Sequence, residues 1–277
     1  MLETYQFTLG NFNCTVINDG NLRMGPTSIF FTGATKAELN TVLAEHNLSP
    51  DALNIPCSCL LVDTGEHRIL VDCGSGGESG GLDGDLGHLF AGLNSIGLTS
   101  NDITHVILTH GHFDHIAACA DDNGTPIFAN ARYIMARDEW DYWVTESQQQ
   151  GKDVFHRKLL GIKEQLQLIE PDAEILDGVR ILDTPGHTYH HICVEFASAD
   201  ETLLCTIDTM DHPLQGKHPT WGANWDVDSA KSIASRKKML QRAVDKKALV
   251  HGFHFPFPGL GHFTNDGDNW QWQAIEE

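Results

Sequence analysis

Short apolar runs and amphipathic segments alternate along the whole chain. Runs of β-branched or aromatic residues bounded by turn residues predict strands, and they cover residues 5–9, 13–17, 57–63, 68–72, 104–109, 131–135, 178–183, 191–197, 202–207 and 247–252. Apolar positions at helical spacing predict helices that begin at residue 35 and cover residues 85–97, 136–147, 153–168 and 228–245. Strands mixed with helices throughout are typical of sheets covered by helices, not of an all-β sandwich. The pattern therefore predicts a layered α/β fold.

Local signals sharpen some of these boundaries. Thr35 and Glu38 have the spacing of a capping box, which starts a helix. Thr64-Gly65-Glu66 separates two strand runs, which predicts a hairpin. No Pro-, Gly- or Ser-rich linker divides the chain. We therefore expect residues 1–277 to form a single domain, with an internal division near residue 165.

The composition excludes several partners. With 38 acidic and 18 basic residues, the formal charge is −20, which would repel a nucleic-acid backbone. No apolar run approaches the roughly 18 residues that cross a bilayer, so we expect no membrane partner. The N-terminus lacks the basic start and apolar stretch of a secretory signal. The seven cysteines are odd in number and lie mostly in apolar runs, which favours packed, reduced thiols and a cytoplasmic protein.

The sixteen histidines are the informative excess, because imidazole is the commonest metal ligand. Four potential ligands follow the apolar run 106–108 directly: His110, His112, Asp114 and His115. In an extended segment residues 110 and 112 project to the same side, and residues 114 and 115 begin the next helix. The turn can therefore present four ligands, divided between two neighbouring ions.

Further ligands must come from other segments, since a catalytic zinc typically has about three protein ligands and a water. The strand run that ends at residue 183 leads through Thr-Pro-Gly to His187. A later strand run ends at Asp208, and the last one reaches His254 before Phe-Pro-Phe-Pro-Gly. The strand before Asp208 is too apolar to carry a charge without a partner. All three side chains are therefore candidate ligands.

These segments, in this order and spacing, resemble the metallo-β-lactamase superfamily from about Phe7 to His262. The resemblance rests on His-x-His-x-Asp-His at 110–115, Thr-Pro-Gly-His-Thr at 184–188, the strand-terminal Asp208 and His254-Phe-Pro-Phe-Pro-Gly. Four segments most resemble the branch that contains methyl parathion hydrolases and N-acyl homoserine lactone lactonases. They are Phe7-Thr-Leu-Gly, Asn130-Ala-Arg-Tyr, Glu139-Trp-Asp-Tyr-Trp143 and the same Phe-Pro-Phe-Pro-Gly.

The resemblance implies an αβ/βα sandwich of two mixed sheets flanked by helices, with two metals at one edge. By position it implies seven ligands: His110, His112 and His187 on one metal, Asp114, His115 and His254 on the second, and Asp208 bridging them. Ligands of this kind suit zinc, while manganese, iron and cobalt stay open.

Four other histidines compete for these positions: His190, His191, His251 and His262. The histidine directly after Pro-Gly and the one before Phe-Pro match the family, so we expect these four to lie outside the ligand set. Asp72, in Leu-Val-Asp-Cys-Gly, resembles the family's buried aspartate that orients a ligand histidine. The alternative for Asp72 is an ordinary turn aspartate at a strand end.

The chemistry expected of such a centre is hydrolysis. Two divalent ions about 3.5–4 Å apart can hold a bridging water as hydroxide and polarise the bond that is attacked. The metals also stabilise the negative charge that develops, without a Ser or Cys nucleophile. Asp114 is a candidate proton shuttle as well as a ligand, and Asp208 completes the catalytic pair. We expect a small-molecule ester as substrate, either a lactone or carboxyl ester or an aryl phosphotriester.

An aromatic wall is expected around this substrate. Trp143 aligns with an aromatic residue of the leaving-group pocket in methyl parathion hydrolases, and further candidates lie in predicted loops: Phe30, Trp221, Trp225 and Phe255. Acyl homoserine lactonases commonly carry a tyrosine three residues after the bridging aspartate. Here that position is Asp211, a departure that counts against this substrate, although Asp211 or His212 is a candidate for the same role.

Other functions stay open. True β-lactamases usually lack a bridging aspartate, so Asp208 counts against that activity. Glutathione-thioester hydrolases and iron-dependent persulfide dioxygenases keep similar ligands, and only the branch motifs separate the chain from them. A non-catalytic metal-binding protein is the alternative from a different class. Homodimers are common in the resembling branch, so a second copy of the chain is a candidate partner.

Overall fold

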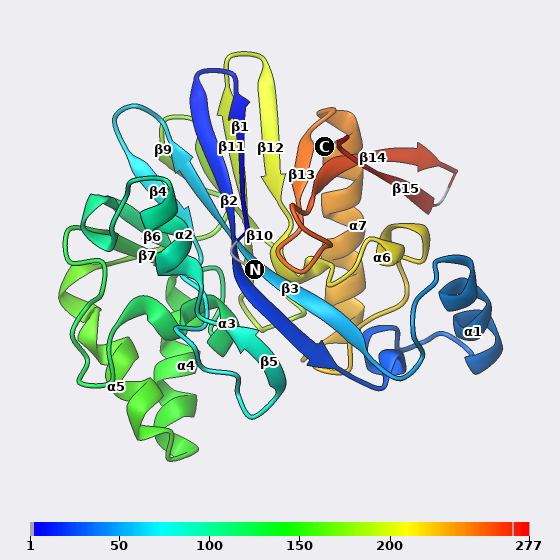
Figure 1. Cartoon of the computed structure of the whole chain (residues 1–277), viewed down its shortest axis with the longest axis horizontal. Coiled ribbons are helices and arrows are strands. Elements are labelled where there is room, and N and C mark those ends of the chain that lie inside the picture. The colour runs from blue at the N-terminus through cyan, green and yellow to red at the C-terminus, as the bar shows by residue number, and fades with distance from the viewer. Residues whose placement is uncertain (1–2, 268, 277) are drawn as a thin grey trace.

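Two β-sheets lie face to face in the computed structural model, which describes residues 3–267 and 269–276 (Figure 1). The first sheet has eight strands in the order β1-β2-β3-β4-β6-β7-β8, with β5 paired to β2. Its strands are β1 (Thr4–Leu9), β2 (Phe12–Met24), β3 (Leu53–Asp63), β4 (Arg68–Val71), β5 (Asp83–Leu86), β6 (His105–Ile107), β7 (Arg132–Ala136) and β8 (Leu166–Ile169). The pairs from β1 to β4 are antiparallel, and β4, β6, β7 and β8 pair in parallel.

The second sheet has seven strands in the order β15-β14-β13-β12-β11-β10-β9. They are β9 (Glu174–Leu176), β10 (Val179–Asp183), β11 (Ile192–Ser198), β12 (Glu201–Cys205), β13 (Leu249–His251), β14 (Leu260–Asp266) and β15 (Asn269–Ala274). Strands β10, β11 and β12 form successive antiparallel pairs, and β12 pairs with β13 in parallel. Strands β10, β12 and β13 therefore run in the same direction, and their carboxyl ends meet at one edge of the sheet.

Helices cover the outer faces of both sheets. They are α1 (Lys36–Glu45), α2 (Leu89–Ser95), α3 (Phe113–Ile116), α4 (Arg137–Gln149), α5 (Asp153–Gly161), α6 (Leu214–Lys217) and α7 (Ser229–Asp245). The predicted capping box starts α1, because Glu38 N–H donates to the Thr35 hydroxyl and Thr35 N–H donates to the Glu38 carboxylate. No helix in the described part of the chain is long and apolar enough to cross a membrane.

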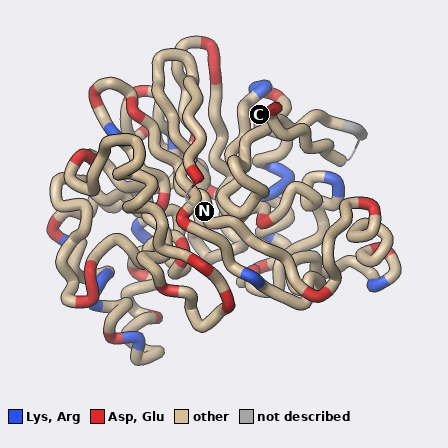
Figure 2. Tube along the Cα trace, in the orientation of Figure 1, with Lys and Arg blue, Asp and Glu red and all other residues tan. Residues whose placement is uncertain are grey.

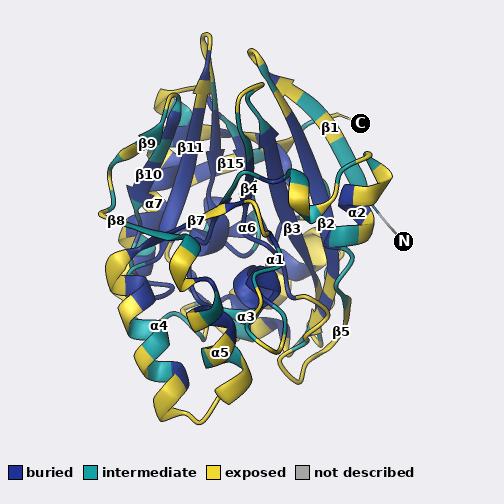
Figure 3. Ribbon diagram, turned by 90° about the vertical axis from the view of Figure 1, so that its left-hand side faces the viewer, coloured by how far each residue is buried: buried dark blue, intermediate teal, exposed yellow. Residues whose placement is uncertain are grey.

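Alternating side chains of the strands divide the interior into three cores. Leu60 of β3 and Leu203 of β12 lie in the core between the two sheets, and each points toward the opposite sheet. Their neighbours point outward: Leu61 packs with the helices on the first sheet, and Leu204 packs with Met239 of α7. Figure 3 shows the strands of both sheets as mostly buried between exposed helix surfaces. The predicted αβ/βα sandwich is confirmed, and the single domain over residues 1–277 stays a prediction.

The structure corrects two predicted helices. Residues 83–86 form β5 because they pair with residues 20–23 of β2, so the helix predicted over 85–97 begins only at Leu89. The helix predicted over 153–168 ends at Gly161, and residues 166–169 form β8 on the edge of the first sheet. In both cases pairing with a neighbouring strand outweighs the local helical pattern. The chain passes from the first sheet to the second between β8 and β9, a few residues after the internal division expected near residue 165.

The cysteines and the charges follow the expectations from composition. All seven cysteines are unpaired and buried, and each belongs to one of the three cores. Acidic residues lie along all parts of the chain, with the fewer Lys and Arg residues among them (Figure 2).

Candidate metal centre

The first ligand turn follows β6, a short inner strand of the first sheet. Asp72, directly after the neighbouring β4, holds this turn: its carboxylate accepts hydrogen bonds from the Thr109 N–H at 2.9 Å and the Thr109 hydroxyl at 2.8 Å. The turn then brings His110 Nε2 to 3.0 Å from His112 Nδ1. Two ring nitrogens two residues apart therefore face the same point, as their spacing predicts.

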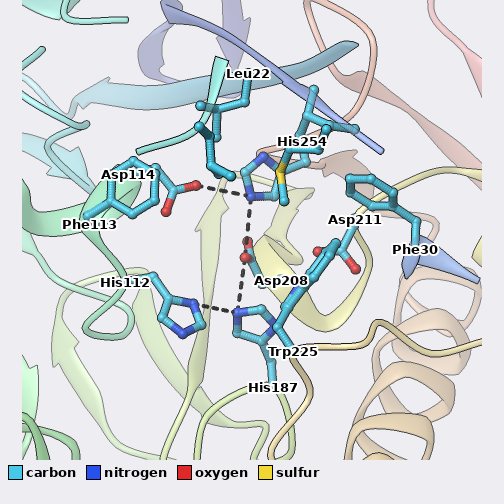
Figure 4. Close-up of a pocket in the computed structure, with 13 residues that line it drawn as sticks. Leu22, Phe30, His112, Phe113, Asp114, His187, Asp208, Asp211, Trp225 and His254 are labelled. Atoms are coloured by element: carbon cyan, nitrogen blue, oxygen red, sulfur yellow. Dashed lines mark hydrogen bonds and ion pairs between the residues drawn. The ribbon is translucent and has the colours of Figure 1, made fainter. Parts of the chain in front are cut away.

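His187 reaches the same place from the second sheet. Gly186, in the turn before it, has a φ of 135°, and a Cβ there would lie 2.0 Å from the Ser232 nitrogen at the start of α7. Glycine is therefore needed for the turn to pack against α7. His187 Nε2 lies 2.9 Å from His112 Nδ1 and 3.2 Å from Asp208 Oδ2 (Figure 4).

Asp208 stands between two groups of ligands. It follows β12 in a short turn, where its backbone N–H donates a hydrogen bond to His191 Nε2 at 3.3 Å. Its Oδ1 lies 3.4 Å from His115 Nε2, and its Oδ2 lies 3.3 Å from His254 Nε2. Because the same carboxylate also contacts His187, Asp208 is placed to bridge two cations.

The second group consists of Asp114, His115 and His254. Asp114 Oδ2 lies 3.6 Å from His115 Nε2 and 3.5 Å from His254 Nε2. The other ring nitrogen of each histidine faces an oxygen at 2.8 Å: His115 Nδ1 faces Asp72 Oδ2, and His254 Nδ1 faces the Pro56 carbonyl. A proton on Nδ1 leaves the Nε2 lone pair directed at the group. Asp72 is thus positioned for the orienting role that the sequence predicted.

The donor set fits a dinuclear divalent metal centre. Donor atoms of His110, His112, His187 and Asp208 lie within 4.8 Å of one another, and so do those of His115, Asp208 and His254. Imidazole and carboxylate are the donors that zinc and related divalent cations take. Among the described residues, His115 Nε2 and Asp208 Oδ1 are buried without a hydrogen-bond partner. A cation between the groups would satisfy both atoms, which are costly to bury alone.

The electrostatics of the two groups agree with a cation. Burial, and then the neighbouring histidines, lower the pKa of His110 and His112 well below the usual value, so both rings are neutral, as metal coordination requires. Burial also disfavours the charged form of His115, but Asp208 and the nearby carboxylates outweigh it and raise the pKa of His115 to about 10. The carboxylates thus favour a positive charge at this position, which a divalent cation supplies.

A thiol lies beside the second group. Cys57 of β3 has its Sγ 3.9 Å from Asp114 Oδ2 and within 4.8 Å of a His254 ring nitrogen. Burial raises the pKa of Cys57 to about 12, which keeps the thiol protonated and agrees with a packing role.

Two buried carboxylates support the histidines and were missed in the sequence. Glu139 of α4 accepts hydrogen bonds from the Gly111 N–H at 3.1 Å and the Thr188 hydroxyl at 3.0 Å. It thereby joins the turn of His110 and His112 to the turn of His187. Asp226 Oδ1 lies 3.4 Å from His187 Nδ1. The Glu139-Trp-Asp-Tyr-Trp143 segment was the only available signal for Glu139, and Asp226 had none.

The competing histidines lie outside the two ligand groups. His191 Nε2 is engaged with the Asp208 backbone, and His190 lies at the surface 3.9 Å from Asp138. His262 Nδ1 lies 2.9 Å from the Ala248 carbonyl. His251 is buried, and burial lowers its pKa to about 3. None of these four belongs to a donor group found among the described residues.

A cavity of about 200 Å³ opens onto the ligands (Figure 4). Metal-ligand candidates form its floor: His112, Asp114, His187, Asp208 and His254. Apolar side chains form most of its wall: Leu22, Met24, Phe30, Ile55, Leu82, Phe113 and Trp225. Asp211 is the one acid of the wall that is not a candidate ligand. The cavity suits a neutral, largely apolar ligand with its reactive group at the floor.

Three predicted pocket residues line this cavity: Phe30, Asp211 and Trp225. Trp143 lines an adjoining cavity of about 580 Å³ on the other side of His112, and its ring centroid lies 5.5 Å from that of His112.

The structure places the other three predicted pocket residues elsewhere. Trp221 and His212 pack on Phe31, with ring centroids 5.8 Å away in each case. Phe255 packs on Trp272 in the core under α7. His212 and Phe255 directly follow residues that face the cavity, so their side chains point to the opposite side. Trp221 stacks on His218 at 3.9 Å. The prediction of these three as wall residues is therefore corrected.

The fold and the two ligand groups define a metal-dependent hydrolase with a dinuclear centre. The sequence profile of the Metallo-beta-lactamase superfamily matches residues 54–254. The chain belongs to this superfamily.

The chain is similar in sequence or structure to three known proteins. An N-acyl homoserine lactonase from Bacillus sp is 27% identical over 247 residues, which cover 82% of this chain and 92% of the relative. A probable metallo-hydrolase from Methanocaldococcus jannaschii is 31% identical over 196 residues, covering 68% of this chain and 84% of the relative. The solved structure of AidC, a dizinc quorum-quenching lactonase in complex with a product, is 25% identical with a TM-score of 0.90 and covers 100% of this chain and 98% of that chain.

Proposed function

We propose that the protein is a dinuclear zinc lactonase that opens the ester ring of a lactone carrying an acyl chain. The observation that carries this proposal is the apolar cavity that opens directly onto the bridging carboxylate Asp208. The relatives named N-acyl homoserine lactonase and the AidC structure, which holds a product of that class, support the same substrate.

Each part of the site has a distinct task in this reaction. The seven ligands would hold two cations, which supply a nucleophile at neutral pH and stabilise the negative charge that develops on the ester. Asp208 fixes the two groups relative to each other, since it contacts histidines of both. Asp114 borders the cavity beside His254, so its carboxylate is placed to carry a proton toward the leaving oxygen. The apolar wall excludes water from the acyl chain.

An aryl phosphotriester is the second candidate substrate. The adjoining cavity is lined by Trp143 and Phe155, whose rings would suit an aromatic leaving group. Its position next to His112 would leave the phosphoryl group near the same floor. The cytoplasmic location and a homodimer stay predictions.

Turnover of a panel of esters by the zinc-loaded protein tests the proposal. The panel contains an N-hexanoyl lactone, an aryl phosphotriester and a glutathione thioester, with acid release and leaving-group release as readouts. We expect the lactone to give the highest kcat/KM. A higher value for the phosphotriester or the thioester would transfer the function to that class. Two bound metals without turnover of any ester would favour the non-catalytic binding protein, and oxygen uptake with a persulfide by the iron-loaded protein would favour the dioxygenase.

A further inference from the structure

Asp211 is a carboxylate held at a fixed place in the cavity wall. It follows the turn that carries Asp208, and its backbone N–H donates a hydrogen bond to Gln215 Oε1 at 2.7 Å. The Gln215 amide in turn donates to the carbonyl groups of Phe30 and Trp221. Only 2% of Asp211 is exposed, and it lies between Phe30 and Trp225 at the cavity (Figure 4). The Asp211 backbone is thus held through its N–H by a glutamine that is itself anchored, and the side chain borders the cavity.

The carboxylate of Asp211 lacks a complete set of partners. Its Oδ2 is buried without a hydrogen-bond partner among the described residues. The nearby acids Asp208 and Asp226 repel it, while His187 and His254 attract it. The buried Arg236 attracts it from a distance, but the guanidinium is bound to the carbonyl groups of Thr209, Pro219 and Trp221. A buried acceptor without a donor is unfavourable, so a donor on a ligand would complement this position.

Asp211 is not placed as a metal ligand. None of its atoms belongs to the groups of donor atoms that contain Asp208. The apolar side chains of the wall, such as Phe30, Leu22 and Ile55, have no hydrogen-bond acceptor. Among the wall side chains, Asp211 therefore offers the strong hydrogen-bond acceptor. It would bind a polar group of the substrate that lies close to the floor of the cavity.

We propose that Asp211 determines substrate specificity by accepting a hydrogen bond from an N–H group of the substrate adjacent to the scissile ester. The favoured substrates are then lactones with an acylamino group on the ring, and lactones with only an alkyl chain are disfavoured. This proposal rests on the proposed lactonase function. Burial, and then repulsion by Asp208, raise the pKa of Asp211 to about 6, so the group is an ionised acceptor in assays at pH 8.

A pair of lactones tests the proposal. Both have the same ring and chain length, but the amide N–H of one is replaced by a methylene group in the other. We expect the wild type to prefer the amide lactone in kcat/KM. Asp211→Leu, which is similar in size and has no acceptor, should reduce this preference by about 10- to 100-fold, the range for a hydrogen bond to a charged acceptor. Asp211→Asn keeps an acceptor oxygen and should fall between the two.

The alternative role, proton donation to the leaving oxygen, gives a different result. An equal loss of kcat for both lactones in Asp211→Leu, with the preference unchanged, would overturn the specificity role. Asp200→Asn, in the exposed turn between β11 and β12, serves as control for the loss of one acid. Zinc content and thermal unfolding of each variant show whether the centre and the fold are intact.

Binding measurements separate this proposal from the proposed function. The ring-opened amide product and its methylene counterpart are titrated into the zinc-loaded wild type and Asp211→Leu by calorimetry. In the wild type we expect the amide compound to bind more tightly than the methylene compound. Asp211→Leu should reduce this affinity ratio by about tenfold or more. If the wild type hydrolyses neither lactone, the lactonase function fails, and this affinity ratio alone decides the role of Asp211. An unchanged ratio rejects that role.

Discussion

The floor and the wall of the cavity are built in different ways. On the floor, the ligand histidines are oriented by further contacts, such as those of His115 with Asp72 and of His254 with the Pro56 carbonyl. On the wall, Leu22, Met24 and Ile55 pack as apolar side chains without directional bonds. The difference teaches that chemistry here depends on a connected polar network, whereas the fit of the acyl chain depends on the shape of the apolar wall. Substitutions on the floor should therefore cost far more than substitutions of apolar wall residues.

The largest effect is expected at the bridging carboxylate. Asp208→Ala removes the candidate ligand that contacts histidines of both groups, so at least one cation should be lost. We expect kcat/KM for the lactone to fall by more than about 100-fold, above the range for partners that only orient ligands. Steady-state kinetics and metal content of the purified variant measure this. Activity within tenfold of the wild type would show that Asp208 is not needed to hold the cations.

The next effect is expected at Asp72, one step away from the metals. Asp72→Asn replaces an acceptor of His115 Nδ1 and of the Thr109 hydroxyl by an amide. The variant should lose about 10- to 100-fold in zinc affinity or in kcat/KM. Competition with a zinc chelator of known affinity measures the first quantity. The exposed variant Asp200→Asn is the control, and equal behaviour of the two variants would reject the orienting role.

A smaller loss is expected at Glu139, which joins two ligand turns but touches no ligand ring. Glu139→Gln replaces one of its two oxygens by a donor, which then faces either the Gly111 N–H or the His190 N–H. We expect kcat/KM to fall by about tenfold, the lower end for supporting contacts. Asp141→Asn on the exposed side of the same helix should match the wild type. A wild-type rate for Glu139→Gln would show that only residues in direct contact with the candidate ligands, such as Asp72, affect the reaction.

The smallest effect is expected at the apolar side chains of the wall. Met24→Ala removes apolar surface from the cavity but leaves the polar network intact. The advantage of a hexanoyl over a butanoyl lactone should shrink by about three- to tenfold, since each buried methylene contributes about 0.8 kcal/mol. The zinc content should not change. Leu176→Ala, on the distant strand β9, is the matched truncation, and the same change in that variant would contradict a wall at Met24.

The floor was more predictable than the wall for a physical reason. His110 to His115 form a local motif, and His187, Asp208 and His254 each follow an apolar strand, so sequence order alone placed them at strand ends. The wall depends on how far β2 and β3 extend and on the course of loops, which local patterns do not specify. Aromatic type was a poor guide, because Trp221 and Phe255 pack away from the cavity. Leu22, Met24 and Ile55 had no signal beyond their place in apolar runs.

The fold shows the same division between local and distant causes. Strands β6, β10 and β12 were predicted because their apolar runs are buried on both faces. Residues 166–168 were predicted as the end of a helix, because the strand that pairs with them, β7, lies about thirty residues earlier and gives no local signal. The support by Asp226 was equally hidden, since its contact with His187 exists only after folding.

A titration of the metal-free protein with zinc, followed by the initial rate of lactone hydrolysis, tests the central claim most directly. If His110, His112, His187, Asp114, His115, His254 and the shared Asp208 hold two cations that carry out the reaction, the rate should rise from near zero and level off at two equivalents of zinc per chain. Full activity before any zinc is added would contradict the account.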